Sequence, residues 1–376
     1  MTGPFLSRMG VILLLSLAAT NATAAAPSNY VPDAAPRMFA ASGARGMVIV
    51  IVDGDRRLIQ GFGETRPGDG QLPDATSLLR IGSLSKLLAV DLMVKLASDG
   101  KLHLDDTLQS HAPHGYRVPQ ASGMRPITLF DLATHTSGLP RSADIPADDK
   151  AGYAQARWNW LQEQGNLPAP GHAALYSNLA FDLLADALSN SAGTSYSQAL
   201  QRYVTGPLGM RDTTDAPSAG QCRRLMDGGA PDAAAPCTGS AENAGSGGLY
   251  STAADMAMWM TDQLGIGKRG ADPDTAISQA IYFQRQSLAS VQGMDIGGHA
   301  SGLGMGWVWL APTPQSPAII EKTGGGGGFM TYMALVPGRQ VGIFVAVTKV
   351  DANMLRTLAQ HVNELAAQLT SAGASP

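Results

Sequence analysis

Segments with strand character lie at the two ends of this 376-residue chain, and helical segments fill the stretch between them. Near the start, the run 46–52 is β-branched and apolar, and Asp53-Gly54-Asp55 is typical of a turn. Residues 57–62 would then form a second strand that runs back along the first, which predicts a β-hairpin. Further strand-like runs come late, at 304–310, 318–322, 329–336 and 341–348. A sheet must therefore collect strands from both termini, and we expect an α/β (α+β) fold with an antiparallel sheet flanked by helices.

The middle of the chain has helical patterns. Apolar residues make 83–98 a largely buried helix that stops at Asp99-Gly100, and 178–189 and 196–204 are further helices. We expect a signal peptide at 1–24, a sheet domain from 25–80 and 236–376, and a mainly helical inserted region at 81–235.

A final helix is predicted near the C-terminus. Its apolar face holds Leu355, Leu358, Val362, Leu365 and Leu369. An amphipathic membrane anchor would need a Lys/Arg-rich polar face, which this segment lacks, so packing against the sheet is favoured. No later segment is apolar and long enough to span a bilayer, which predicts no transmembrane anchor after signal cleavage. A peripheral contact with a membrane stays open.

The first residues have the pattern of a secretory signal. Arg8 precedes an apolar run at 11–19, and Ala22-Thr23-Ala24 fits the small-residue site of a signal peptidase. The apolar run is well short of the roughly 20 residues that a membrane span needs. We expect cleavage near Ala24 and a periplasmic mature protein.

Charge and metal-binding residues exclude several classes of partner. The net charge is −4 and Lys and Arg form no cluster, so nucleic acid is not an expected partner. The histidines are scattered without a ligand spacing, and we expect no metal and no cofactor. Cys222 and Cys237 are the only cysteines, and export favours a disulfide between them over two free thiols.

Ser83 and Lys86 are the candidate nucleophile and its base partner. They lie three residues apart at the start of a predicted helix, where their side chains can meet. A lysine that is desolvated near other cations can lose its proton far below its usual pKa of about 10.4. Ser98 and Lys101 repeat the spacing across the Asp99-Gly100 helix stop, so their side chains would not share a face.

Two further motifs follow in the order expected of an active-site serine hydrolase. Tyr176-Ser177-Asn178 and Lys322-Thr323-Gly324 each occur once. Tyr176 can relay a proton if cations lower its pKa, and Asn178 can hold a substrate amide. Lys322 and Thr323 can hold a substrate carboxylate. Alone, each residue has an ordinary structural explanation, but together they indicate one site.

Five consecutive glycines, 324–328, follow these residues. A strand without side chains admits a ligand backbone, and a free N–H there could form an oxyanion hole with the N–H of Ser83. A flexible loop is the alternative interpretation.

These motifs resemble the class C β-lactamase and penicillin-binding family of serine hydrolases. The resemblance is carried by Ile81-Gly-Ser-Leu-Ser-Lys86, 128–140, Pro207-Leu-Gly-Met210, 248–255 and Lys322-Thr-Gly324. Finer features, at 63–68, 176–187, 221–226 with Cys237, and 322–329, resemble one branch, the AmpH type of D-alanyl-D-alanine carboxypeptidase/endopeptidase. The resemblance implies that Gly325 supplies the second oxyanion N–H, and that peptidoglycan stem peptides are substrates and β-lactams covalent inhibitors.

Two other polar motifs are given structural roles. His135 could suggest a Ser-His-Asp triad, but nothing else marks one, and we expect it to hold a loop. Thr252 and Asp255 are predicted to form a capping box ahead of a helix.

We therefore expect the protein to be a penicillin-binding serine DD-peptidase that forms an acyl-enzyme on Ser83. A β-lactamase differs chiefly in how fast water clears that acyl-enzyme, which no motif records. An esterase on the same scaffold would not need the carboxylate site at Lys322. A catalytically silent penicillin sensor is the alternative outside the enzymes.

Overall fold

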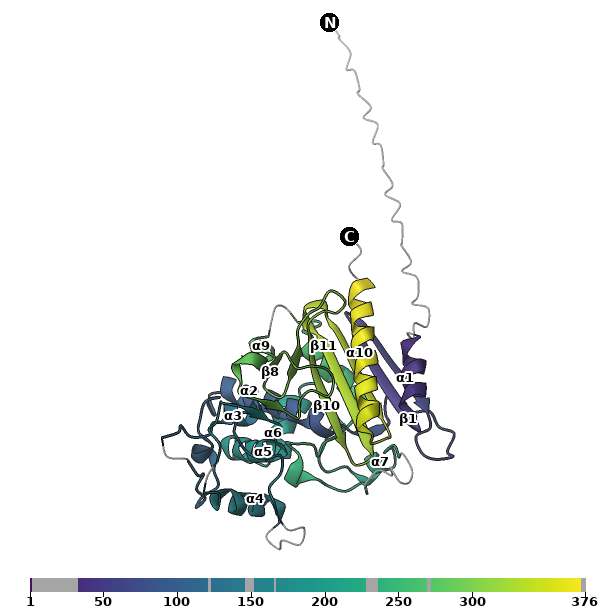
Figure 1. Cartoon of the computed structure of the whole chain (residues 1–376). Coiled ribbons are helices and arrows are strands. Elements are labelled where there is room, and N and C mark those ends of the chain that lie inside the picture. The colour runs from purple at the N-terminus through teal and green to yellow at the C-terminus, as the bar shows by residue number, and fades with distance from the viewer. Residues whose placement is uncertain are drawn as a thin grey trace.

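The computed structural model describes Met1 and residues 33–120, 123–145, 152–165, 167–227, 236–268 and 272–372. Apart from Met1, the predicted signal sequence at 1–24 lies outside these residues. The described chain forms a large sheet with helices on both sides (Figure 1).

In the described part of the chain, eight strands form the large sheet in the order β2-β1-β12-β11-β10-β9-β8-β6, and every neighbouring pair is antiparallel. The strands are β1 Gly46–Asp53, β2 Arg56–Gly63, β6 Ile281–Gln284, β8 Gly302–Gly304, β9 Val308–Leu310, β10 Ile319–Gly326, β11 Phe329–Val336 and β12 Val341–Val347. Pairing of β1 with β12 joins the two ends of the chain. The predicted hairpin and the sheet built from both termini are confirmed.

Two short pairs of strands in the described segments lie outside this sheet. The antiparallel pair is β3 Leu78–Arg80 with β5 Tyr250–Thr252, and the parallel pair is β4 Ala174–Leu175 with β7 Val291–Gln292. The first pair precedes the segment that carries Ser83, and the second ends beside Tyr176. Both pairs therefore fix segments that lead into the candidate site.

Helices cover both faces of the large sheet (Figure 1). The α-helices are α1 Ala34–Ser42, α2 Ser85–Ser98, α3 Leu129–Ala133, α4 Tyr153–Gln162, α5 Asn178–Ala192, α6 Tyr196–Leu200, α7 Ala219–Cys222, α8 Ala253–Gln263, α9 Pro273–Ser278 and α10 Ala352–Ala372. Short helical turns are η1 Gly82–Leu84, η2 Leu108–His111, η3 Gln201–Thr205, η4 Ala241–Asn243, η5 Arg285–Ser287 and η6 Pro337–Arg339.

The strands of the sheet centre are buried on both faces because helices pack on each. On β1, Val48, Val50 and Val52 belong to the core beneath the larger helical layer. Met47, Ile49 and Ile51 alternate with them and pack in a second core with α1 and α10. This explains why 46–52 is uniformly apolar rather than alternating.

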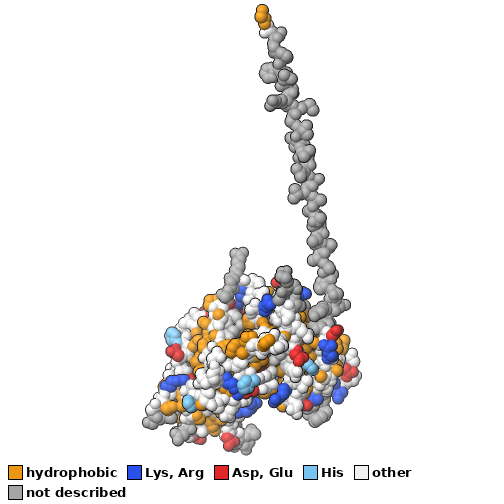
Figure 2. Space-filling view, turned by 45° about the horizontal axis from the view of Figure 1, so that its top comes forward, with side chains coloured by type: hydrophobic (Ala, Val, Ile, Leu, Met, Phe, Trp, Pro, Cys, Tyr) orange, Lys and Arg blue, Asp and Glu red, His pale blue; other side chains and the backbone are white. Residues whose placement is uncertain are grey.

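The final helix packs on the sheet as predicted. Leu355, Leu358, Val362 and Leu365 of α10 are buried in the second core. Within the described residues, no helix has the length and apolar character needed to cross a membrane. On the face seen in Figure 2, basic and acidic side chains are interspersed.

Three segments differ from their predictions. The strand expected at 304–310 is a hairpin of β8 and β9, because Gly306 has a positive φ of 72° and turns the chain between them. The helix expected at 196–204 is α6 followed by a turn of π-helix, η3. The helix α1 was not predicted, because a nine-residue Ala-rich segment has little periodic signal.

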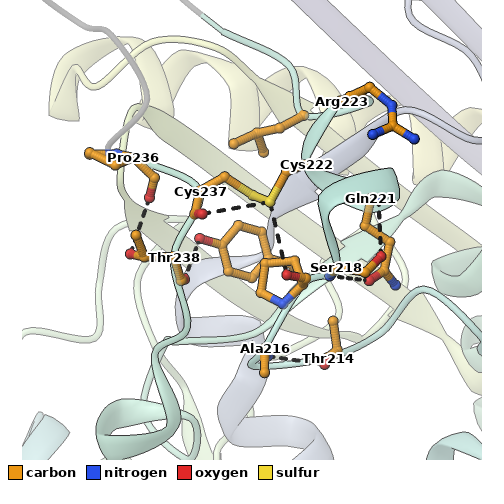
Figure 3. The surroundings of a disulfide bond; sticks show 12 residues. Thr214, Ala216, Ser218, Gln221, Cys222, Arg223, Pro236, Cys237 and Thr238 are labelled. Atoms are coloured by element: carbon orange, nitrogen blue, oxygen red, sulfur yellow. Dashed lines mark hydrogen bonds between the residues drawn. A yellow bond between two sulfur atoms is a disulfide. The ribbon is translucent and has the colours of Figure 1, made fainter.

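The predicted disulfide is present. Cys222 at the end of α7 is bonded to Cys237, with the two Cα atoms 5.7 Å apart (Figure 3). Beside it, the Tyr250 hydroxyl donates a hydrogen bond to the Thr238 carbonyl at 2.9 Å. The bridge thus lies against the strand pair that precedes Ser83.

Candidate active site

Ser83 lies in η1, one turn before the buried helix α2. The preceding Gly82 has φ of 54°, and a Cβ there would lie 2.6 Å from Gly325 N. Only glycine therefore lets this turn approach the glycine strand so closely. Two side chains also stabilise this turn through its carbonyl groups. Ser85 Oγ donates to Gly82 O at 2.7 Å, and Thr331 Oγ1 donates to Ile81 O at 3.0 Å.

Lys86 is buried beneath Ser83. Its Nζ lies 3.3 Å from Ser83 Oγ and donates to Asn178 Oδ1 at 2.8 Å. It also donates to the Ser246 carbonyl oxygen. The two side chains of the Ser-x-x-Lys motif thus meet as the spacing predicts, and the amine has three oxygen partners.

Tyr176 completes the contacts around Ser83. Its hydroxyl donates to Ser83 Oγ at 2.6 Å. Three cationic groups surround its ring: Lys86 Nζ at 4.8 Å, Lys322 Nζ at 4.9 Å and Arg141 Cζ at 5.0 Å from the ring centroid. The hydroxyl that touches the serine is therefore placed in a positive field.

This field changes the acidity of Lys86 and Tyr176. Burial lowers the pKa of Lys86, with Tyr176 opposing the shift and Lys322 adding to it. Burial raises the pKa of Tyr176, but the charges of Lys322 and Lys86 and the hydrogen bond with Ser83 outweigh it and bring the pKa down to about 7. Near neutral pH, the pair can therefore hold one proton fewer than the separate groups would, and it can accept one from Ser83.

Lys322, Thr323 and the glycines lie on β10 as predicted. Lys322 is buried, and with Thr323 and Tyr176 it lines a small cavity. The strand continues through Gly326, paired with β11, and Gly327 and Gly328 then form a turn in which both have positive φ. The glycine run is thus strand first and hairpin turn afterwards, and Gly325 and Gly326 are exposed.

Gly324 is required by close packing. A Cβ at this position would lie 2.5 Å from the Ile81 carbonyl oxygen and 3.0 Å from Leu84 Cδ1. The backbone that carries Ser83 therefore rests directly on the glycine strand. Together with the approach of Gly82 to Gly325 N, this contact places the backbone of the Ser83 turn close to that of Gly325.

His135 supports the Tyr176 segment and has no triad geometry. Its Nδ1 accepts from Ser177 N at 3.1 Å, its carbonyl accepts from Leu175 N at 2.9 Å, and its ring stacks on Tyr176 with centroids 4.6 Å apart. Burial, and then the charges of Lys86, Lys322 and Arg141, hold its pKa well below 6.5. The ring is therefore neutral at physiological pH and holds a loop, as the sequence predicts.

The other two motifs are structural. Ser98 donates a hydrogen bond to Asp274, and Lys101 is exposed beyond the helix stop, so this second Ser-x-x-Lys pair does not form a site. Thr252 accepts from Asp255 N at 3.2 Å, but the Asp255 carboxylate accepts from Asp212 N and Thr213. One half of the predicted capping box forms.

Sequence reasoning missed two participants in the site. One is Ser246, which contributes a backbone carbonyl to Lys86, and a carbonyl leaves no signal in residue identity. The other is Asp182, which is 2% exposed and acts electrostatically on Lys86. It lies one helical turn after Asn178 on α5, and a carboxylate between the apolar residues Phe181 and Leu183 was the available signal.

Comparisons with known proteins agree with this geometry. Residues 33–368 match the family described as Beta-lactamase. The chain is 44% identical to D-alanyl-D-alanine-carboxypeptidase/endopeptidase AmpH of Escherichia coli, over 91% of this chain and 89% of that protein. A crystal structure of a beta-lactamase/D-alanine carboxypeptidase from Yersinia pestis has a TM-score of 0.84 and 44% identity, covering 89% of this chain and 95% of that one.

A more distant structure shares the fold. A class C beta lactamase from Rhodobacter sphaeroides has a TM-score of 0.72 at 24% identity, covering 90% of this chain and all of that one. The large antiparallel sheet with its helical layers is therefore common to all three chains.

Proposed function

Because this chain belongs to the beta-lactamase family, we propose that it is a penicillin-binding serine DD-peptidase, a D-alanyl-D-alanine carboxypeptidase/endopeptidase of peptidoglycan stem peptides. The observation that carries the proposal is the position of Ser83 Oγ, 3.3 Å from Lys86 Nζ and 2.6 Å from the Tyr176 hydroxyl. The buried cation Lys322 beside the same tyrosine favours substrates that bear a carboxylate.

In the proposed mechanism, Ser83 Oγ attacks the carbonyl carbon of the D-alanyl peptide bond, and its proton passes to the Lys86–Tyr176 pair. The N–H groups of Ser83 and Gly325 stabilise the oxyanion. The pair returns the proton to the departing amine, and the peptide C–N bond breaks. Water, losing a proton to the same pair, then attacks the acyl-enzyme and releases Ser83.

The remaining site residues bind the substrate. Asn178 holds an amide of the peptide, and Lys322 and Thr323 hold the terminal carboxylate. The backbone of Gly324 and Gly325 binds the peptide backbone along β10, and the exposed Gly325 leaves room for it. If the leaving group is terminal D-alanine, the reaction is that of a carboxypeptidase, and if it is the amine of a neighbouring stem peptide, it is that of an endopeptidase.

We also propose that the protein acts in the periplasm. The signal pattern at 1–24 and the disulfide Cys222–Cys237 support an oxidising, exported location.

Mass spectrometry with a labelled penicillin tests the nucleophile. We expect one adduct on the wild-type protein and none on Ser83→Ala. An equal adduct on both proteins, or none on either, would contradict the assignment. Release of D-alanine from a D-alanyl-D-alanine pentapeptide, compared with turnover of nitrocefin, separates a peptidase from a β-lactamase.

A further inference from the structure

The side chain of Arg80 packs against the turn of the glycine hairpin, the turn that joins β10 to β11 at 326–329. A Cβ on Gly327 would lie 2.4 Å from Arg80 Cδ, 2.7 Å from its Nε and 3.2 Å from its Cζ. The arginine is therefore in contact with the backbone of this turn, and any side chain at Gly327 would have to displace it. Arg80 is half-buried and is the last residue of β3, three residues before Ser83.

Groups outside the hairpin hold the Arg80 side chain in place. Its Nη2 donates to the Pro236 carbonyl oxygen at 2.7 Å, and its guanidinium lies over the Tyr250 ring, with Cζ 4.5 Å from the centroid. Tyr250 lies directly opposite Arg80 in the β3–β5 pair, is fully buried, and bonds through its hydroxyl to the Thr238 carbonyl. Pro236 and Thr238 flank Cys237 of the disulfide (Figure 3). The arginine is thus fixed by groups on both sides of Cys237.

The composition of the hairpin turn explains why it needs support from another element. Gly326 pairs with Phe329, so Gly327 and Gly328 form a two-residue turn, with φ of 59° and 89°. Glycine loses more conformational freedom on folding than any other residue, so consecutive glycines specify the conformation of a turn weakly. Contacts from outside the hairpin must therefore help to fix it.

The segment that leads into Ser83 contacts the glycine run at three points. The two residues after Arg80 approach Gly324 and Gly325 through their backbones. The third contact is that of Arg80 with Gly327, and a side chain makes it. These contacts lie before, at and after Gly325, so they fix the position of its backbone relative to the nucleophile segment.

We propose that Arg80 is a positioning residue for the oxyanion hole, which supports the turn at Gly327 and thereby holds the Gly325 N–H in place. The inference rests on the proposed function, which gives the N–H groups of Ser83 and Gly325 their part in acyl transfer. In this role, Arg80 acts on the reaction only through the hairpin. Loss of an oxyanion-hole donor typically slows a reaction by about 100- to 1000-fold, so a misplaced donor should slow it on the order of tenfold.

Arg80→Ala tests the proposal through the rate of acylation. We expect the rate constant for acylation by penicillin to fall about tenfold, with little change in the Kd of the complex that precedes acylation, because the oxyanion forms only during the reaction. Arg80→Lys keeps an aliphatic stem and a cation, and should keep most of the rate. Arg57→Ala is the matched control, because it removes the same side chain from an exposed position on β2, and should acylate at the wild-type rate.

The carbonyl band of the acyl-enzyme gives a measurement that a merely structural role of Arg80 would not change. Hydrogen bonds to a carbonyl oxygen lower its stretching frequency, so infrared difference spectra of a penicillin with an isotopically labelled β-lactam carbonyl report the oxyanion hole directly. We expect the band to move to higher frequency, or to split, in Arg80→Ala. Circular dichroism melting checks that each variant is folded at the assay temperature.

Gly327→Asn tests the contact from the side of the hairpin. Asparagine is chosen because it accepts a positive φ more readily than most other side chains. In the wild-type background its Cβ would collide with Arg80, and acylation should slow, whereas in the Arg80→Ala background the collision is absent and the further loss should be smaller. Additive effects of the two substitutions would contradict a direct contact between them.

The outcomes separate this proposal from the proposed function. A wild-type protein that forms no acyl-enzyme with penicillin would contradict the proposed function, and this role of Arg80 with it. A wild type that is acylated, together with an Arg80→Ala variant that keeps both the rate and the carbonyl band, would overturn the role of Arg80 alone. Slower acylation with an unchanged band would also overturn it, because the effect would then lie outside the oxyanion hole.

Discussion

The Nζ atoms of Lys86 and Lys322 both lie within 5 Å of the Tyr176 ring centroid, at 4.8 and 4.9 Å. They reach it from different elements, Lys86 from α2 and Lys322 from β10. At the scale of single residues, the acidity of Tyr176 thus depends on two cations that the sequence separates widely. The chemistry of Ser83 should respond to a change in either charge, even where the hydroxyl geometry is unaltered.

Lys322→Gln should move the pH dependence of acylation. Below a pKa of about 7, Tyr176 is protonated and cannot accept the Ser83 proton, so the acylation rate of the wild type should fall as pH falls through about 7. Loss of the Lys322 charge raises that pKa, and the acidic limb should move to higher pH by roughly one unit or more. Stopped-flow measurement of the acylation rate with a fluorescent penicillin, at about ten pH values between roughly pH 5 and 9, gives the pH at which the rate falls.

Arg141→Gln is the comparison for this measurement. Its guanidinium also lies near the Tyr176 ring, at 5.0 Å, but the residue is exposed and solvent screens its charge. The acidic limb of the pH–rate profile should therefore shift less in Arg141→Gln than in Lys322→Gln. Equal shifts in the two variants, or no shift in Lys322→Gln, would argue against control of Tyr176 by the buried lysine.

At the scale of elements, the contact between η1 and β10 aligns the nucleophile with the glycine strand. Gly324→Ala should separate them, because the new Cβ would lie 2.5 Å from the Ile81 carbonyl oxygen. We expect penicillin acylation to slow on the order of 100-fold, since misplacement by about 1 Å has effects of that size. The Tm should also fall.

Gly338→Ala is a suitable control for Gly324→Ala, because Gly338 is an exposed glycine in the turn between β11 and β12 and a Cβ there would meet nothing within 4 Å. It should acylate at the wild-type rate. If Gly324→Ala acylated equally fast, the packing of η1 on β10 would not be what positions Ser83.

Elements with a strong periodic or composition signal could be predicted from the sequence, and those set by tertiary contacts could not. Burial of β1, β11, β12 and α10 could be predicted, because each of these segments has its own pattern of apolar residues. The segment 304–310 looked like one strand because its residues suit a strand, whereas the turn at Gly306 is a backbone conformation. The bond from Lys86 to the carbonyl of Ser246 and the contact of Arg80 with Gly327 arise only when distant segments meet.

At the scale of the molecule, the candidate site lies where the helical layer meets the sheet. α2 and α5 supply Lys86 and Asn178, β10 supplies Lys322, and the short pair β4–β7 ends at Tyr176. The motifs predicted these partners because their order is shared with a family, but their meeting requires the sheet built from both chain ends. That the inserted region 81–235 forms a unit of its own stays a prediction. Its helix α2 shares one hydrophobic core with β1 and β10.

The disulfide should contribute to the stability of the whole molecule through the unfolded chain. Cys222 and Cys237 are 15 residues apart, and closing a loop of that length restricts the unfolded ensemble by about 3 kcal/mol in the chain-entropy description. The double variant Cys222→Ser/Cys237→Ser should therefore unfold at a lower urea concentration and have a Tm lower by several degrees, roughly 2–4 °C for each kcal/mol. Urea titrations with and without reductant measure this on the wild type as well.

The same variant distinguishes an effect on the unfolded chain from one on the site. If the bridge acts mainly by restricting the unfolded chain, the folded variant should be acylated by penicillin at the wild-type rate well below its Tm. The bridge also lies beside Tyr250, whose hydroxyl bonds to Thr238, and β5 pairs with the strand before Ser83. Slower acylation with an unchanged unfolding midpoint would therefore mean that the disulfide positions the nucleophile segment. Its effect on the conformational entropy of the unfolded chain would then contribute little to stability.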